Sequence, residues 1–129
     1  MRGSIPAEAV SVYNSALELS NRGDFPTALT EYGKAIALYP KFLEAYNNIG
    51  EIYSKMGDGD KAINTYLQAL TIERNYRVLL NLGVEYYNRG QTLPALSHFK
   101  EAIALKADFV EGHFYAGMAY FNIKDHANA

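Results

Sequence analysis

Apolar and small residues recur along this chain at the spacing of an α-helix, and short polar stretches interrupt them. Tyr46, Ile49, Gly50 and Tyr53 form one such series, because residues three and four positions apart share one helix face. No stretch competes with the alternation of a β-strand, so the pattern predicts an all-α protein. We predict seven helices, at residues 7–22, 25–38, 42–56, 60–73, 76–89, 92–106 and 109–123.

The same residue types return after 33 or 34 positions. Three series share this period: Ala28, Ala62, Ala95 and Ala129; Ala16, Gly50, Gly83 and Gly117; and Tyr32, Tyr66 and Phe99. A unit this short cannot bury its own apolar face and must pack against copies of itself. The repeat therefore favours an extended binding surface over a catalytic pocket.

Each period reads as two helices joined by a tight turn. Gly23, Gly57 and Gly90 follow the first helix of three periods, where a left-handed residue closes the last turn. Asp24, Asp58 or Asp60, and Thr92 are predicted to accept hydrogen bonds from the first N–H groups of the next helix.

Small residues predict where the two helices of a period meet. Gly50 with Ala62, and Gly83 with Ala95, are expected to let the two backbones approach closely. Tyr53 and Tyr86 are expected to fill the space beside these contacts.

These positions together resemble the tetratricopeptide repeat, a helix-turn-helix unit of 34 residues. The second period carries the pattern as Tyr46, Ile49, Gly50, Tyr53, Gly57, Ala62, Tyr66 and Ala69. The resemblance implies a right-handed α-solenoid of stacked antiparallel helix pairs. It divides the chain into a tag-like leader and helix start at 1–8 and a repeat domain at 9–129, with units 9–42, 43–75 and 76–109 and a partial fourth at 110–129.

The resemblance also implies a function: a non-catalytic protein–protein interaction module that holds an extended peptide or a partner helix in its concave groove. The first helix of each unit would line this groove. Carried over by position, the peptide-binding residues are Asn14, Asn47, Asn48, Arg77, Leu80, Asn81, Val84, Tyr87 and Tyr115.

Asn14, Asn48 and Asn81 occupy equivalent positions in successive units, and Tyr115 replaces asparagine in the fourth. A primary amide can pair with both the C=O and the N–H of a peptide backbone. One alternative is therefore that the three asparagines grip an extended peptide. The other is that each ties neighbouring first helices together.

Members of the family that bind chaperone tails share a carboxylate clamp of five residues. The matching positions here hold Tyr13, Leu17, Asn48, Arg77 and Asn81, so most of the charge-assisted contacts are missing. The C-terminal half of the groove is instead apolar, through Leu80, Val84, Tyr87, Phe114, Met118 and Phe121. This favours an amphipathic ligand, with scattered apolar surface as the alternative.

Little in the sequence supports catalysis, and we predict no metal site and no cofactor. His98, His113 and His126 lack the spacing of metal ligands, and His113 is expected to lie in the core or an interface. Asp58, Gly59 and Asp60 lack the later acidic ligands of a calcium loop, which favours a capped turn.

Composition excludes several partners. A net charge of -2 gives no positive field for nucleic acid, and the longest apolar runs are far shorter than the ~20 residues of a membrane span. The chain has no cysteine, and Met1-Arg2-Gly3-Ser4 reads like an expression leader. The compartment is therefore unknown, with the cytoplasm as the default.

The last predicted helix is apolar around most of its circumference, so we expect something to cover it. Three alternatives follow: the chain is a fragment of a longer array, it self-associates through residues 110–129 as a structural scaffold, or it is the substrate-binding arm of a larger enzyme.

Overall fold

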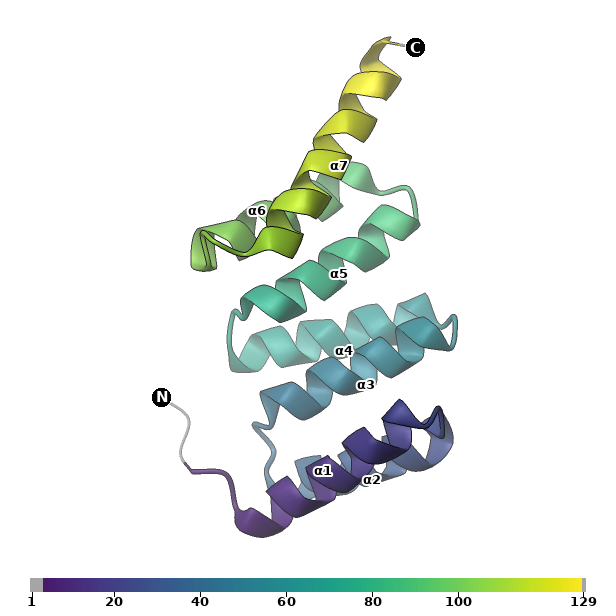
Figure 1. Cartoon of the computed structure of the whole chain (residues 1–129), viewed down its shortest axis with the longest axis vertical. Helices are drawn as coiled ribbons and strands as arrows, with labels where there is room; N and C mark the ends of the chain where they lie inside the picture. Colours follow the sequence, from purple (N-terminus) through teal and green to yellow (C-terminus); the bar gives the residue numbers. More distant parts are fainter. Residues whose placement is uncertain (1–3, 129) are drawn as a thin grey trace. The chain divides into compact units, whose positions relative to one another are not determined.

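The computed structural model describes the backbone of residues 4–128 and the side chains of residues 4–125, and it contains seven α-helices and no strand in that range (Figure 1). The chain forms two compact units that divide between Ile72 and Glu73. Unit 1 holds α1 (Ala7–Asn21), α2 (Phe25–Leu38), α3 (Leu43–Lys55) and α4 (Gly59–Ile72). Unit 2 holds α5 (Tyr76–Asn88), α6 (Thr92–Leu105) and α7 (Val110–Asn128).

The predicted helices are confirmed, with one difference at the C-terminal end. The first six begin and end within one residue of their predicted limits, whereas α7 continues past residue 123 to Asn128. Neither glycine nor proline follows Ile123 in the sequence, so nothing local stops the helix there.

Left-handed glycines close three of the turns, as predicted. Gly23, Gly57 and Gly90 have φ angles of 81°, 82° and 79°. At the second turn, Gly57 N–H donates to the Ser54 carbonyl at 3.0 Å and Asp58 N–H donates to the Tyr53 carbonyl at 2.8 Å. This is the Schellman pattern, which satisfies carbonyls at the helix end without any side chain.

The predicted caps at helix starts are only partly confirmed. Asp58 Oδ1 accepts from the N–H of Lys61 at 3.2 Å, as expected. Asp24 precedes α2, but its side chain accepts no capping hydrogen bond. Pro26 has no backbone N–H, so one of the potential donors is missing. Thr92 lies inside α6, and its hydroxyl donates to Asn122 Oδ1 of α7 at 3.2 Å.

Within each unit, consecutive helices pack against each other, and an aromatic ring from the second helix of a pair lies over a glycine of the first. A Cβ on Gly50 would lie 2.4 Å from Tyr66 Cε1, and one on Gly83 would lie 2.5 Å from Phe99 Cε1. Such distances are impossible for real atoms, so both positions require glycine in this packing.

The predicted approach of Gly83 to Ala95 is confirmed, because a Cβ on Gly83 would also lie 3.2 Å from the Ala95 carbonyl oxygen. Tyr53 and Tyr86 of the first helices lie next to the second helix of each pair, since Lys61 Nζ is 5.5 Å from the centre of the Tyr53 ring and His98 stacks on Tyr86 at 5.5 Å. The rings that contact the glycines come from the second helix of each pair, where they can reach across the helix interface.

An ion pair between Arg74 and Glu101 lies at the start of unit 2. The Arg74 guanidinium donates to both carboxylate oxygens of Glu101 on α6, at 2.8 and 2.6 Å. This bond raises the pKa of Arg74 and lowers the pKa of Glu101. Asn75 then caps α5, since its side chain accepts from the N–H groups of Arg77 and Val78.

No helix in the described range has both the length and the apolar composition to cross a membrane. Within that same range, no three histidine, cysteine or acidic residues come together as a metal site would require.

Candidate functional site

In unit 1, a hydrogen bond joins the two first helices, α1 and α3. Asn48 Nδ2 on α3 donates to the hydroxyl of Tyr13 on α1 at 2.8 Å. The Tyr13 ring stacks on Phe42, with centroids 4.8 Å apart, and lies tilted against Tyr32. Burial is the main cause that raises the pKa of Tyr13. Asn48 therefore ties α3 to α1, which is the packing alternative for this asparagine.

The ring of Tyr32, which lies against Tyr13, carries a buried hydroxyl. Its side chain is fully buried in the core of unit 1, and no hydrogen bond of ordinary geometry reaches its hydroxyl from the described residues. Burial raises the pKa of Tyr32 to about 12, although Asn48 lies close enough to lower it in part, so the hydroxyl stays neutral.

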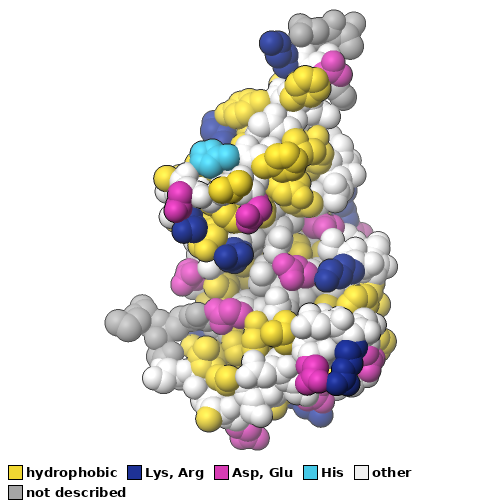
Figure 2. Space-filling view, in the orientation of Figure 1, with side chains coloured by type: hydrophobic (Ala, Val, Ile, Leu, Met, Phe, Trp, Pro, Cys, Tyr) yellow, Lys and Arg dark blue, Asp and Glu magenta, His cyan; other side chains and the backbone are white. Residues whose placement is uncertain are grey.

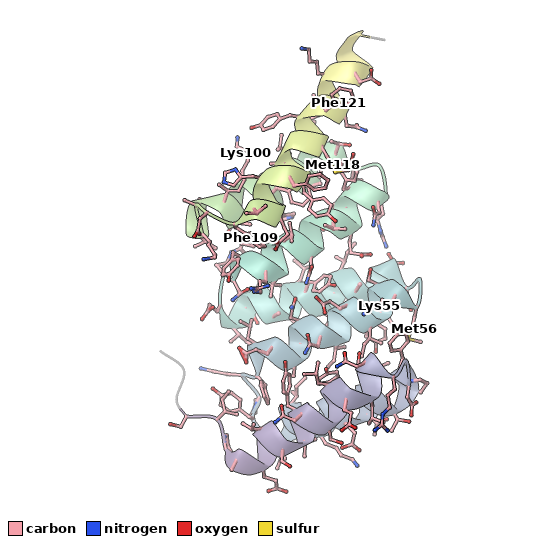
Figure 3. The ribbon with its side chains drawn as sticks, viewed as in Figure 1. Lys55, Met56, Lys100, Phe109, Met118 and Phe121 are labelled. Atoms are coloured by element: carbon pink, nitrogen blue, oxygen red, sulfur yellow. The ribbon has the colours of Figure 1, made fainter. Side chains whose placement is uncertain are left out.

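Unit 2 presents an apolar pocket between α5 and α7. The pocket has a volume of about 510 Å³ and is lined by Tyr87 of α5 and by His113, Phe114, Gly117, Met118 and Phe121 of α7. Hydrophobic side chains gather over α7 in Figure 2, and Figure 3 labels Met118 and Phe121 on this helix.

Two phenylalanines make this pocket more exposed than an ordinary core. Phe114 is 62% exposed and Phe121 is 73% exposed. Aromatic rings of this size contribute strongly to binding when a ligand covers them. The pocket has the chemistry to hold an apolar side chain.

Histidine 113 lies at the rim of the pocket, where sequence reasoning expected a residue of the core or an interface. Its side chain is exposed, and Nε2 lies 2.7 Å from the Ala107 carbonyl oxygen. His113 borders this pocket and also a hollow between α6 and α7. His98 behaves differently, since it stacks on Tyr86 at 5.5 Å and burial lowers its pKa.

Comparison with known proteins decides the family. A model of the tetratricopeptide repeat matches residues 41–108, which is more than half of the chain, and a second TPR repeat model matches residues 21–57. This chain is a tetratricopeptide repeat protein.

Similar proteins share the repeat over different lengths. Human tetratricopeptide repeat protein 13 is 31% identical over 103 residues, which cover 79% of this chain but only 12% of that protein. The Sgt2 TPR domain from Aspergillus fumigatus has a TM-score of 0.88 at 14% identity, over 98% of this chain and 85% of that one.

YrrB, whose structure is described as that of a TPR protein with an unusual peptide-binding site, is 27% identical with a TM-score of 0.76. The match covers 88% of this chain and 59% of YrrB. The all-α fold of stacked helix pairs is therefore that of the tetratricopeptide repeat solenoids.

The predicted binding residues of this tetratricopeptide repeat protein differ in solvent exposure and in hydrogen bonding. In unit 1, Asn14 is exposed, while Asn47 and Asn48 are half-buried. The three asparagines of the series thus differ in environment: Asn14 is open to solvent, Asn48 is bonded to Tyr13, and Asn81 of unit 2 is half-buried.

In unit 2 of this tetratricopeptide repeat protein, the predicted residues follow one face of α5. Arg77 is exposed, with its guanidinium 5.4 Å from the centre of the Tyr76 ring, and Val84 and Tyr87 are half-buried. Leu80 is only 9% exposed, so it belongs mainly to the core.

Tyr115 interrupts the asparagine series by packing between rings. It stacks on Phe99 at 5.6 Å and meets Phe114 edge to face at 5.4 Å. Of the predicted binding residues, Tyr87 alone lines the apolar pocket, together with Phe114, Met118 and Phe121, which the repeat also predicts on this apolar surface. The sequence places Gly117 in the repeat series but does not predict that it and His113 line this pocket.

Proposed function

We propose that this tetratricopeptide repeat chain is a non-catalytic interaction module that captures an apolar side chain of a peptide in the pocket between α5 and α7. The observation that carries the proposal is the pair of exposed rings, Phe114 and Phe121, beside a pocket of about 510 Å³. An exposed apolar hollow of this kind is typical of a contact site. The peptide-binding site described for the similar YrrB structure supports the same kind of function.

The residues of α5 between the pocket and Arg77 indicate the length and charge of the ligand. Tyr87, Val84, Asn81 and Arg77 follow one another at three- and four-residue spacing, so they lie along one helix face. Ten residues separate Tyr87 from Arg77, which corresponds to about 15 Å along a helix. An extended peptide covers that length in about four or five residues.

The ligand that fits this face has an apolar anchor and an acidic residue about four or five positions away. The anchor would enter the pocket, and the carboxylate would pair with the exposed Arg77 guanidinium. We retain Asn81, Val84 and Tyr87 as contacts along the path between them. Asn14, Asn47 and Asn48 remain candidates for a ligand that extends over unit 1.

The test uses a fluorescein-labelled peptide with a phenylalanine anchor and an aspartate five positions away, in both chain directions. Fluorescence anisotropy should show saturable binding to the protein. The Phe121→Ser variant should weaken this binding by about tenfold or more, since a buried aromatic ring contributes about 1.5–3 kcal/mol. Arg77→Gln should weaken it by about threefold, and less at high salt.

Val110→Ser is the matched control, because Val110 lies on the same helix, is also 73% exposed and does not line the pocket. Binding by this variant should be unchanged. The proposal fails if neither peptide binds, or if the valine and phenylalanine variants lose binding equally.

A further inference from the structure

The pocket between α5 and α7 carries two side chains with a nitrogen or oxygen atom, Tyr87 and His113. Its other side chains are those of Phe114, Met118 and Phe121, which offer two rings and a thioether (Figure 3). A polar group that loses water on binding and finds no partner weakens the complex. The hydrogen-bonding roles of Tyr87 and His113 therefore restrict which side chain the pocket can hold well.

The contact of His113 with the connection between α6 and α7 determines which ring nitrogen carries the hydrogen. Nε2 lies 2.7 Å from the carbonyl oxygen of Ala107, which is a hydrogen-bond distance. A carbonyl oxygen can only accept, so Nε2 is the nitrogen that donates. A neutral imidazole has a single N–H, and Nδ1 is therefore left with its lone pair as an acceptor.

Nδ1 of His113 is open to a ligand. No described residue makes a hydrogen bond to this nitrogen, and the side chain is exposed at the rim of the pocket. The half-buried Tyr87 hydroxyl is less selective, because a hydroxyl can rotate to donate or to accept. Of the two polar groups, only His113 requires a donor on the ligand.

We propose that the side chain captured in this pocket is a tryptophan, whose indole N–H donates to Nδ1 of His113. This inference rests on the proposed function, since it concerns the same pocket. Its ring packs against Phe114 and Phe121 and contacts the thioether of Met118, a favourable neighbour for an aromatic ring. His113 is thus the residue that selects among apolar anchors.

Two properties favour tryptophan over the other large apolar side chains. Phenylalanine, leucine and methionine have no donor for Nδ1, so the imidazole would lose water without gaining a partner. Tyrosine has a donor but a smaller ring, which covers less of the exposed Phe114 and Phe121 surface. The volume of about 510 Å³ leaves room for an indole.

The first test changes only the ligand, so it does not depend on the folding of any variant. Three labelled peptides carry tryptophan, benzothienylalanine or phenylalanine as the anchor, with the aspartate five positions away. Benzothienylalanine has the shape of tryptophan, with sulfur in place of the indole N–H. At about pH 8, where imidazole groups are neutral, the tryptophan peptide should bind at least about fivefold more tightly than the other two.

The second test removes the acceptor from the protein. His113→Phe keeps a ring at the rim but leaves a bound indole N–H without a partner, so the tryptophan peptide should bind about tenfold more weakly. The benzothienylalanine peptide should change by less than about twofold. Since His113 is exposed, the variant should keep the Tm and the circular dichroism spectrum of the parent.

Tyr87→Phe removes the other polar group and separates its role from that of His113. It should change the binding of all three peptides by a similar factor, so the preference for tryptophan stays. A preference that Tyr87→Phe abolishes and His113→Phe retains would overturn the inference, because the indole would then donate to Tyr87.

Equal binding of the tryptophan and benzothienylalanine peptides would also overturn it. The proposed function would survive that result if Phe121→Ser still weakened both peptides. If none of the three peptides binds the parent protein, the proposed function fails and the selection by His113 fails with it.

Discussion

Units 1 and 2 pack their helix pairs in the same way but differ in the side chains that their first helices present. In both, a ring of the second helix lies over a glycine of the first, as Tyr66 does over Gly50 and Phe99 over Gly83. The first helices of unit 1 are joined by the hydrogen bond from Asn48 to Tyr13, whereas α5 and α7 of unit 2 border an apolar pocket. The repeat thus constrains the contacts inside a helix pair and leaves the other side chains of the first helices free to differ. Binding specificity is expected where the units differ.

Substituting the glycine under the ring should destabilise both units, because both share this contact. Gly50→Ala and Gly83→Ala should each lower the free energy of unfolding by about 1–3 kcal/mol, because the added Cβ would overlap a buried ring. Urea unfolding measures this change. Gly117→Ala is the matched control, because a Cβ there would meet nothing within 4 Å, and it should instead raise stability by about 0.5–1 kcal/mol. If all three substitutions had the same effect, the ring would not be the reason for glycine.

The hydrogen bond of unit 1 separates the two alternatives for the asparagine series. Asn48→Ala should lower the free energy of unfolding by about 1 kcal/mol, since it removes the donor to the half-buried Tyr13 hydroxyl. A double-mutant cycle with Tyr13→Phe should give a coupling energy of similar size. Asn14→Ala, at the exposed equivalent position, should change stability by less than about 0.5 kcal/mol.

The opposite result would also be informative. If Asn48→Ala kept full stability and weakened the binding of a peptide, this asparagine would grip a ligand rather than tie α3 to α1. The two units would then differ less than the hydrogen bond suggests.

The ion pair of unit 2 should have the smallest effect. Arg74 and Glu101 are 54% and 38% exposed, so solvent screens their attraction, and Glu101→Gln should cost only about 0.5 kcal/mol. The pKa of Glu101 is lowered in the folded state, so the stabilisation is present above the pKa of the unfolded carboxyl and is lost as pH falls through the folded value.

Unfolding curves of the parent and the Glu101→Gln variant should therefore converge in acid and in about 1 M salt. A difference that persists under both conditions would assign the role of Glu101 to packing rather than to charge.

The fold could be predicted from the sequence because the same residue types recur at equivalent positions in several units. Helical spacing and the 33- or 34-residue period identified seven helices, and the turn glycines were correctly predicted to be left-handed. These features are local, so they need no knowledge of which helices meet.

The remaining details depend on contacts between helices, which the period alone does not determine. Tyr53 and Tyr66 are both aromatic and in register, but only the structure shows that Tyr66 lies over Gly50. Likewise, Thr92 bonds Asn122 across two helices instead of capping its own. His113 is exposed at the rim of the pocket between α5 and α7, and spacing within the sequence cannot reveal this.

The close pairing of consecutive helices also has a consequence for the order in which the chain can fold. In unit 1, α1 pairs with α2 and α3 with α4, so each main interface closes over a few turn residues. Loop-closure entropy is small for such local contacts, and topologies of this kind fold quickly. During synthesis, the first pair can form as soon as α2 leaves the ribosome, before the chain that makes the apolar surface of α7 has been translated.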